Sequence, residues 1–187
     1  MLDYNLLIST ARDFEGQAEC ELWFLLVAFG DETPIISKVG ISGLLVARTH
    51  SDPRGFIDFL RKIMTEKDTN YFQFVQKIYP IDKTVASDIP SIKEMALELI
   101  KTHPLCRNPE STYRITIRKR NTPLKTEDII TEIAAVIPYK VDLKQYNWNL
   151  EIEIIGDYTG LAIITEENIF KPISEQRTLL ARNFEEN

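Results

Sequence analysis

Hydrophobic positions in the first 80 residues switch between the strand period and the helix period. Short apolar runs of strand length occupy residues 4–10, 34–39, 44–47 and 71–79. Apolar residues recur at helical spacing over 14–29 and 53–64. Gly30 ends the first helical stretch and Pro53 opens the second, in positions where helices commonly end and begin. The predicted order, β-α-β-β-α-β, is that of a ferredoxin-like, or split βαβ, module.

The second half of the chain mixes the same two periods in another order. The pattern predicts helices over 91–101 and 126–137 and strands over 113–120, 148–155 and 158–165. Thr126, followed by Glu127 and Asp128, has the character of an N-cap with an acidic first turn. We therefore expect an α+β protein. It has a ferredoxin-like N-terminal domain at 1–82, an α/β domain at 83–170, and a charged, loosely docked tail at 171–187.

Charge sets one of these elements apart. The segment Lys101–Lys144 holds nine Lys/Arg and five Asp/Glu, whereas the rest of the chain holds 13 and 23, and the whole chain has a net charge of −6. The predicted strand over 113–120 alternates apolar residues with arginines and ends in the cluster Arg118-Lys119-Arg120. Such a concentration is typical of a surface that binds the phosphates of a polyanion. A solvated edge strand that is protected by charge would show the same pattern.

The chain offers little catalytic chemistry. His50, Ser51 and Asp52 are adjacent, which favours a hydrogen-bonded turn over a catalytic triad. Glu151 and Glu153 fit the exposed alternation of a strand better than a pair of catalytic carboxylates. Neither a phosphate-binding glycine loop nor a metal-ligand spacing occurs in the sequence. We expect a protein that is not an enzyme and that needs neither a cofactor nor a metal.

The cysteines, the short apolar runs and the first residues of the chain favour a reduced, cytoplasmic protein. Cys20 and Cys106 are far apart, and Cys20 lies in an apolar helical pattern that predicts a buried thiol. Trp23 and Trp148 are expected in the cores. The longest apolar run, Leu22–Phe29, has eight residues, which is too short to span a bilayer. The first residues lack the basic flank and apolar centre of a signal peptide.

Three separated segments resemble the THUMP domain family. They are YRITIRKRNTPLKTEDIITEIA from Tyr113, KVDLK from Lys140 and LEIEIIGDYTGLAI from Leu150, and the resemblance covers about 86–170. THUMP domains typically follow a small ferredoxin-like domain, which fits the predicted first module. No catalytic domain follows within the 187 residues, so the chain resembles the stand-alone THUMP proteins related to the tRNA acetylation adaptor. The resemblance implies a protein that presents tRNA to a separate cytidine acetyltransferase, which makes N4-acetylcytidine.

The basic strand and its flanks supply the candidate RNA-binding residues. They are Arg107, Arg114, Arg118, Lys119, Arg120, Lys125, Lys140 and Lys144. Guanidinium groups bind phosphate bidentately and ammonium groups act as point charges, so these residues would recognise backbone and shape rather than base identity. The resemblance implies the acceptor stem and 3′ end of tRNA as the ligand. Two alternatives stay open: a ferredoxin-like module that binds a protein or small molecule, and an RNA-binding partner of another tRNA modification enzyme.

Overall fold

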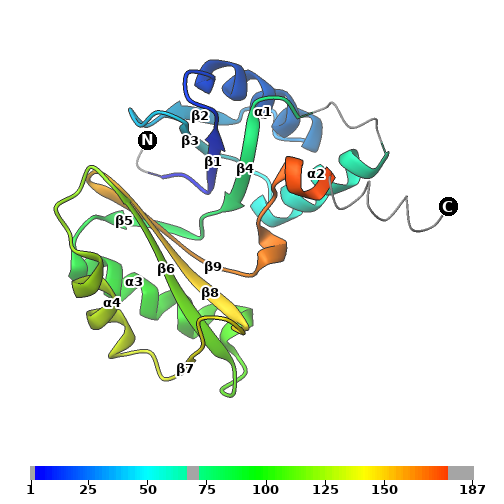
Figure 1. Cartoon of the computed structure of the whole chain (residues 1–187). Coiled ribbons are helices and arrows are strands. Elements are labelled where there is room, and N and C mark those ends of the chain that lie inside the picture. The colour runs from blue at the N-terminus through cyan, green and yellow to red at the C-terminus, as the bar shows by residue number, and fades with distance from the viewer. Residues whose placement is uncertain (1–2, 67–71, 177–187) are drawn as a thin grey trace. The chain divides into compact units, whose positions relative to one another are not determined.

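The chain folds into two compact units. The computed structural model describes residues 3–66 and 72–176 (Figure 1). Within them, the first unit comprises residues 3–80 together with the segment from Glu167 onward, and the second unit comprises Ile81–Glu166. The chain therefore enters the second unit after Pro80, where the sequence predicted a boundary after residue 82.

The first unit is the predicted ferredoxin-like module. Its elements are β1 (Leu6–Thr10), α1 (Glu15–Phe29), β2 (Ile35–Lys38), β3 (Leu44–Arg48), α2 (Pro53–Glu66) and β4 (Val75–Pro80). The strands form one antiparallel sheet in the order β2-β3-β1-β4. Strand β4 begins at Val75, later than predicted, and Tyr71 lies outside the described residues.

The core of this unit lies between one face of the sheet and the two helices. Leu6 and Ile8 of β1 alternate toward the helices, and they pack in one cluster with Leu22 of α1 and Leu60 of α2. The turn before β3 depends on Gly43, whose φ is +77° and whose added Cβ would lie 2.9 Å from the carbonyl oxygen of Thr10. Any larger residue there would meet rigid backbone in a conformation that L side chains avoid.

Two residues of α1 lie outside this core, contrary to the sequence prediction. Cys20 is exposed, and Trp23 is 42% exposed. The helix is apolar on more than one side, so its hydrophobic spacing did not distinguish the buried face from the outer one. The buried face is formed by Ala18, Leu22, Leu25 and Leu26.

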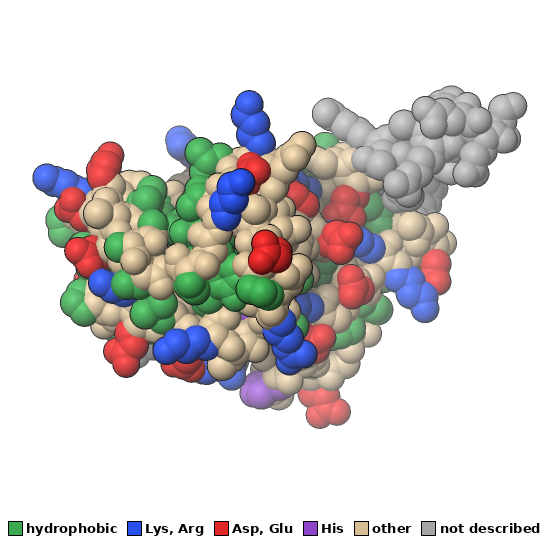
Figure 2. Space-filling view, turned by 90° about the horizontal axis from the view of Figure 1, so that it is seen from below, with side chains coloured by type: hydrophobic (Ala, Val, Ile, Leu, Met, Phe, Trp, Pro, Cys, Tyr) green, Lys and Arg blue, Asp and Glu red, His purple; other side chains and the backbone are tan. Residues whose placement is uncertain are grey.

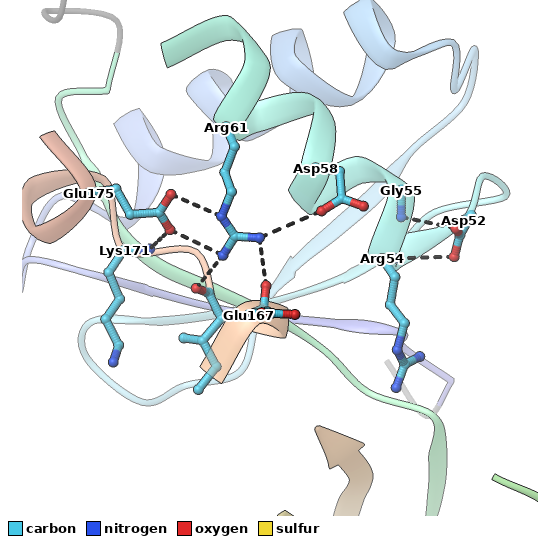
Figure 3. Close-up of polar contacts among 9 residues, drawn as sticks. Asp52, Arg54, Gly55, Asp58, Arg61, Glu167, Lys171 and Glu175 are labelled. Atoms are coloured by element: carbon cyan, nitrogen blue, oxygen red, sulfur yellow. Dashed lines mark hydrogen bonds and ion pairs between the residues drawn. The ribbon is translucent and has the colours of Figure 1, made fainter. Parts of the chain in front are cut away.

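The described part of the C-terminal segment, up to residue 176, packs on the first unit, and the remainder of the tail predicted over 171–187 lies outside the described residues. Phe170 is buried, and its N–H and carbonyl exchange hydrogen bonds of 2.8 and 2.9 Å with Ile78 of β4. Figure 3 shows the guanidinium of Arg61, on α2, enclosed by this segment: it donates to the carbonyls of Glu167 (2.6 Å) and Ile169 (2.9 Å) and pairs with Glu175 (3.0 Å). Residues 172–176 are helical, and 177–187 lie outside the described part.

The second unit is a mixed sheet with helices on one face (Figure 1). Its elements are β5 (Lys83–Ala86), α3 (Ile89–Thr102), η2 (Pro104–Cys106), β6 (Thr112–Arg120), α4 (Thr126–Ala134), β7 (Lys140–Val141), β8 (Trp148–Ile155) and β9 (Tyr158–Ile164), followed by the short η3 (Glu166–Asn168). The strand order is β5-β9-β8-β6-β7, with β6 parallel to both β7 and β8. The four-residue strand β5 was not predicted, because Lys83 and Thr84 give it no apolar pattern.

Helix α3 is capped by a side chain, whereas α4 is not. Asp88 accepts a hydrogen bond of 2.8 Å from the N–H of Ser91 at the start of α3. Lys125 occupies the N-cap position of α4, and Thr126 is the first helical residue, so the predicted N-cap role of Thr126 is wrong. Trp148 is fully buried, as predicted, and stacks on Tyr113 with ring centroids 5.0 Å apart.

Candidate nucleic-acid interface

Strand β6 carries its arginines on one face only. Ile115 and Ile117 pack against the core under α3 and α4, together with the buried Tyr113. Because side chains alternate along a strand, Arg114, Thr116, Arg118 and Arg120 share the opposite face. This division agrees with the alternation expected from the sequence.

The neighbouring strand β8 is buried along its whole length, and it places acids beside these arginines. Glu153 is completely buried and Glu151 almost so, so the prediction that they are exposed is wrong. The parallel register sets Arg118 opposite Glu153. Arg120 donates to Glu153 at 2.6 Å, and Arg118 contacts both Glu151 and Glu153, the latter at 3.1 Å.

Further hydrogen bonds extend this arrangement into a polar ladder formed by Thr116, Asn149, Glu151, Arg118, Glu153 and Arg120. Thr116 donates to Asn149 at 2.9 Å, and Asn149 donates to Glu151 at 2.7 Å. Carboxylates removed from water need partners of opposite charge, since an uncompensated buried ion is costly. Arg118 and Arg120 are half-buried and satisfy that need, so much of their charge is balanced within the sheet.

The other predicted cations near the C-terminal end of β6 are Lys119 and Lys125. Lys119 is exposed and donates to the carbonyl of Leu124 at 2.7 Å. Lys125 is exposed at the start of α4, where Glu127 and Asp128 occupy the first turn. A helix N-terminus favours anions, but these two carboxylates already supply negative charge there. The end of β6 is therefore of mixed charge rather than the strongly basic patch expected from the sequence.

A second group of predicted residues gathers at the opposite end of β6. Lys140 of β7 lies opposite Thr112, the first residue of β6. The hydroxyl of Tyr139 donates to the carbonyl of Cys106, so the residue before Lys140 is bonded to the residue before Arg107. Arg107 and Lys140 are both exposed. Together with Arg114 and Lys144 they form what we call the β7-end cluster.

The loop after β7 presents an exposed apolar side chain, that of Leu143, beside these cations. The carboxylate of Asp142 accepts hydrogen bonds from the N–H groups of Gln145 (2.8 Å) and Lys144 (2.9 Å), which closes a turn. These bonds, with the nearby charge of Lys140, hold the pKa of Asp142 below its ordinary value. The turn leaves Leu143 67% exposed, next to the exposed Lys144. An exposed apolar side chain can contact an unstacked nucleobase, and the neighbouring cations can contact phosphates.

Arg114 joins the cluster through an aromatic contact. Its guanidinium carbon lies 4.3 Å from the centre of the Tyr146 ring, and the Tyr146 hydroxyl lies 3.2 Å from a carboxylate oxygen of Glu166. Burial raises the pKa of Tyr146, with a smaller opposing effect from Arg114. Within the described part of the chain, Nε of Arg114 is buried and has no hydrogen-bond partner, so it is not itself offered to a ligand. The flat, cationic guanidinium over an aromatic ring is still a suitable contact for phosphate or for a base.

The structure therefore divides the eight predicted residues into two groups. Arg107, Arg114, Lys140 and Lys144 lie at the β7 end, and Arg118, Lys119, Arg120 and Lys125 lie toward the other end. Nine residues of strand separate the ends of β6 by about 26 Å, at roughly 3.3 Å per residue. Figure 2, a view from below, shows Lys and Arg side chains standing apart, with apolar and acidic side chains between them.

Other chemistry is sparse among the described residues. No group of three His, Cys, Asp or Glu side chains in residues 3–66 and 72–176 is placed to hold a metal ion. Burial raises the pKa of the Cys106 thiol to about 12, which makes it a poor nucleophile. Within the same ranges, none of the helices has the length and apolar character of a bilayer span.

Comparison with known proteins identifies one of the two units. A family model described as THUMP domain matches residues 86–164. No curated protein matches the sequence. Among solved structures, PH1313 from Pyrococcus horikoshii Ot3 is similar with 18% identity and a TM-score of 0.63, over 89% of this chain and 55% of that one.

Two further solved structures share the fold. TrmN from Thermus thermophilus has 12% identity and a TM-score of 0.53, over 86% of this chain and 45% of that one. A 4-thiouridine synthetase in complex with RNA and bound ATP has 13% identity and a TM-score of 0.55, over 90% of this chain and 42% of that one. This chain thus corresponds to about half the length of these proteins or less.

The family match begins at the last residue of β5 and ends at the last residue of β9, so it covers the second unit almost completely. The first unit has the strand order of a ferredoxin-like module. The second unit of this chain is therefore a THUMP domain, which follows a ferredoxin-like module.

Proposed function

We propose that this protein binds tRNA through its THUMP domain and takes part in tRNA modification. The observation that carries the proposal is the β7-end cluster, which places four cations and an exposed apolar loop on that domain. A second support is the fold shared with a 4-thiouridine synthetase that was solved in complex with RNA. The family match to residues 86–164 agrees with both.

The cluster offers three kinds of contact to a nucleic acid. Lys140 and Lys144 are exposed ammonium groups that would neutralise phosphates, and Arg107 adds a guanidinium fork beside them. Leu143 and the Arg114–Tyr146 pair would contact bases that are not stacked in a helix. Contacts of this kind position a backbone and an unpaired end, and they read little sequence. They suit the acceptor stem and 3′ end of tRNA.

We further propose that the protein is a non-catalytic adaptor. Anchoring of the acceptor end would set which distant nucleotide reaches the active site of a separate enzyme. The resemblance of Asn5–Thr10, Glu19–Leu26 and Gly40–Ala47 to the acetylation-adaptor group of THUMP proteins favours a cytidine N4-acetyltransferase as that enzyme. Service to a different tRNA modification enzyme is the alternative, and reconstitution of cytidine acetylation with and without this chain distinguishes the two.

A salt titration of tRNA binding tests the RNA-binding proposal. The variant Arg107→Ala/Lys140→Ala/Lys144→Ala removes three phosphate contacts, so the slope of log affinity against log salt should decrease by about two, at roughly 0.7–0.9 per contact. A matched control, Lys38→Ala/Arg48→Ala/Lys62→Ala, removes three cations from the first unit, of which Lys38 and Lys62 are exposed and Arg48 is half-buried. An equal decrease in both variants would refute the cluster as the site.

Removal of the 3′-terminal nucleotides from the tRNA tests which end is bound. We expect the trimmed tRNA to bind more weakly to the wild-type protein, and the difference to disappear in the triple variant. A footprint confined to the anticodon arm would refute the acceptor-end proposal while leaving tRNA binding itself intact.

A further inference from the structure

The outer side of α1 exposes large apolar side chains on the first unit. Phe24 is 67% exposed and Trp23 42%, and their rings meet edge to face with centroids 5.2 Å apart. Ile35, on the neighbouring strand β2, is also exposed. Single exposed hydrophobic residues are common, but adjacent aromatic and aliphatic side chains on two elements indicate an interaction surface.

These side chains border a groove between α1 and β2. The groove has a volume of about 530 Å³ and is lined by Glu19, Cys20, Trp23, Phe24, Pro34 and Ile35. A second hollow of about 550 Å³ adjoins the other side of α1, where Gly16 and Phe74 border it, and Cys20 lines both. The outer side of the helix is therefore flanked by two depressions that can receive side chains.

Strand β2 forms an edge of the sheet, directly beside the groove. In the described part of the chain it pairs with β3 alone, so the backbone groups on its other edge are available. Proteins usually protect such an edge with charges or proline. Here Lys38 is the only charged residue of the strand, and it pairs with Glu19 at 3.9 Å. A free edge beside apolar pockets is the arrangement that accepts an added strand.

Charge decides what kind of segment fits. The charged residues of α1 are all glutamates, and Glu19 lines the groove, where Lys38 lies 3.9 Å from its carboxylate. Glu21 lines the second hollow, where its carboxylate accepts hydrogen bonds from the backbone N–H groups of residues 73–75. Glu32, in the loop before β2, is exposed. This acidic rim repels the phosphates of RNA, and in a symmetric dimer it would oppose its own copy. A segment that carries Lys or Arg is complementary to it.

We propose that the groove between α1 and β2 docks an extended segment of a partner protein. The segment adds a strand to the free edge of β2, places apolar side chains against Trp23 and Phe24, and turns Lys or Arg toward Glu19 of α1. This surface lies on the ferredoxin-like module and is separate from the β7-end cluster, so it goes beyond the proposed RNA binding.

Panning of a phage-displayed library of random peptides on the whole protein tests the proposal. We expect enrichment of sequences that alternate apolar residues and contain Lys or Arg. Fluorescein-labelled versions of the selected peptides should bind the Phe24→Ser variant at least about 10-fold more weakly, because an aromatic side chain at an interface commonly dominates affinity. Ile173→Ser, which removes an aliphatic side chain of the first unit that is 54% exposed, should bind as the wild type does.

Modified peptides test each part of the proposal. Replacing the basic residues of a peptide by Glu should abolish binding. N-methylation at alternate residues should also abolish binding when the methylated N–H groups are those that face β2, and should not when they are the intervening ones. Thermal melting confirms that the variants are folded. Enrichment of acidic peptides, or equal binding to Phe24→Ser, would overturn the proposal. So would competition by tRNA, or a concentration-dependent dimer that Phe24→Ser abolishes, since these would assign the groove to RNA or to a second copy.

Discussion

The carboxylate of Glu153 lies 2.6 Å from the guanidinium of Arg120, and the whole of Glu153 is buried within the THUMP sheet. Arg118 contacts the same carboxylate from the position directly opposite in the parallel register. The most basic stretch of the sequence is thus partly an internal feature, because two of its arginines neutralise acids of the next strand. Substitution of these arginines should therefore lower the stability of the fold, whatever its effect on ligand binding.

Arg120→Ala should destabilise the THUMP domain. The change removes one of the cations that pair with the buried carboxylate of Glu153, and loss of one member of a buried pair costs about 3 kcal/mol. Lys119→Ala removes an exposed neighbour of the same charge and should change the free energy of unfolding by less than about 0.5 kcal/mol. Urea denaturation of both variants compares them. Equal stability would show that the pair contributes little.

The sequence predicted the elements of both units well, because apolar spacing follows burial wherever one side of an element is buried. The order β-α-β-β-α-β and the alternation of β6 were correct for this reason. The pattern failed where both sides of an element are apolar or both are buried. In α1 it could not show that Trp23 lies outside, and in β8 an alternation of Glu and Ile concealed a strand with two buried faces.

The candidate site was predicted as a set of residue types, without its arrangement. Charge counting selected eight candidate cations, but it could not show that Glu151 and Glu153 would lie beside Arg118 and Arg120, since they are more than 30 residues apart in the chain. The link between the segments of Arg107 and Lys140 also depends on a hydrogen bond between distant residues, Tyr139 and Cys106. The hydrophobic pattern along the chain does not predict such contacts, because they depend on the register of the sheet and on how the loops pack.

The buried Asp31 gives the first unit a pH-dependent stability. Burial would raise its pKa, but hydrogen bonds from Thr49 (2.6 Å) and from the N–H of His50 (3.0 Å) outweigh this, and the pKa of Asp31 is lowered. A carboxyl group whose pKa is lower in the folded state stabilises at neutral pH, and the stabilisation is lost as the pH falls through its folded pKa, below about 4.

Asp31→Asn should therefore cost about 1–3 kcal/mol at pH 7, and the difference from the wild type should narrow below about pH 4. Urea denaturation at pH 7, 5 and 3 measures it. Asp3→Asn is the control, because Asp3 is exposed and forms only a surface ion pair with Arg48. A difference that stays constant at every pH would contradict the assignment.

Arg61 holds the C-terminal segment on the first unit (Figure 3). Arg61→Ala removes its bonds to the carbonyls of Glu167 and Ile169 and its pair with Glu175, and should cost about 2 kcal/mol. The amides of Ile78 and Phe170, which exchange hydrogen bonds across this contact, should then exchange with deuterium about 10-fold faster or more. Lys62→Ala, on the same helix, should leave their rates unchanged.

The Arg114–Tyr146 pair offers a test of the RNA contact that separates charge from stacking. Arg114→Lys keeps the positive charge but loses the planar guanidinium that lies over the ring, so the salt slope of tRNA binding should stay the same while affinity falls about 5-fold to 10-fold. Arg114→Gln should weaken binding further and reduce the slope by about 0.7–0.9. Tyr146→Phe keeps the ring and removes only the contact with Glu166, and should bind tRNA as the wild type does. If Arg114→Lys retained full affinity, the guanidinium would act as a charge alone, and the RNA contacts of the β7-end cluster would be limited to phosphates.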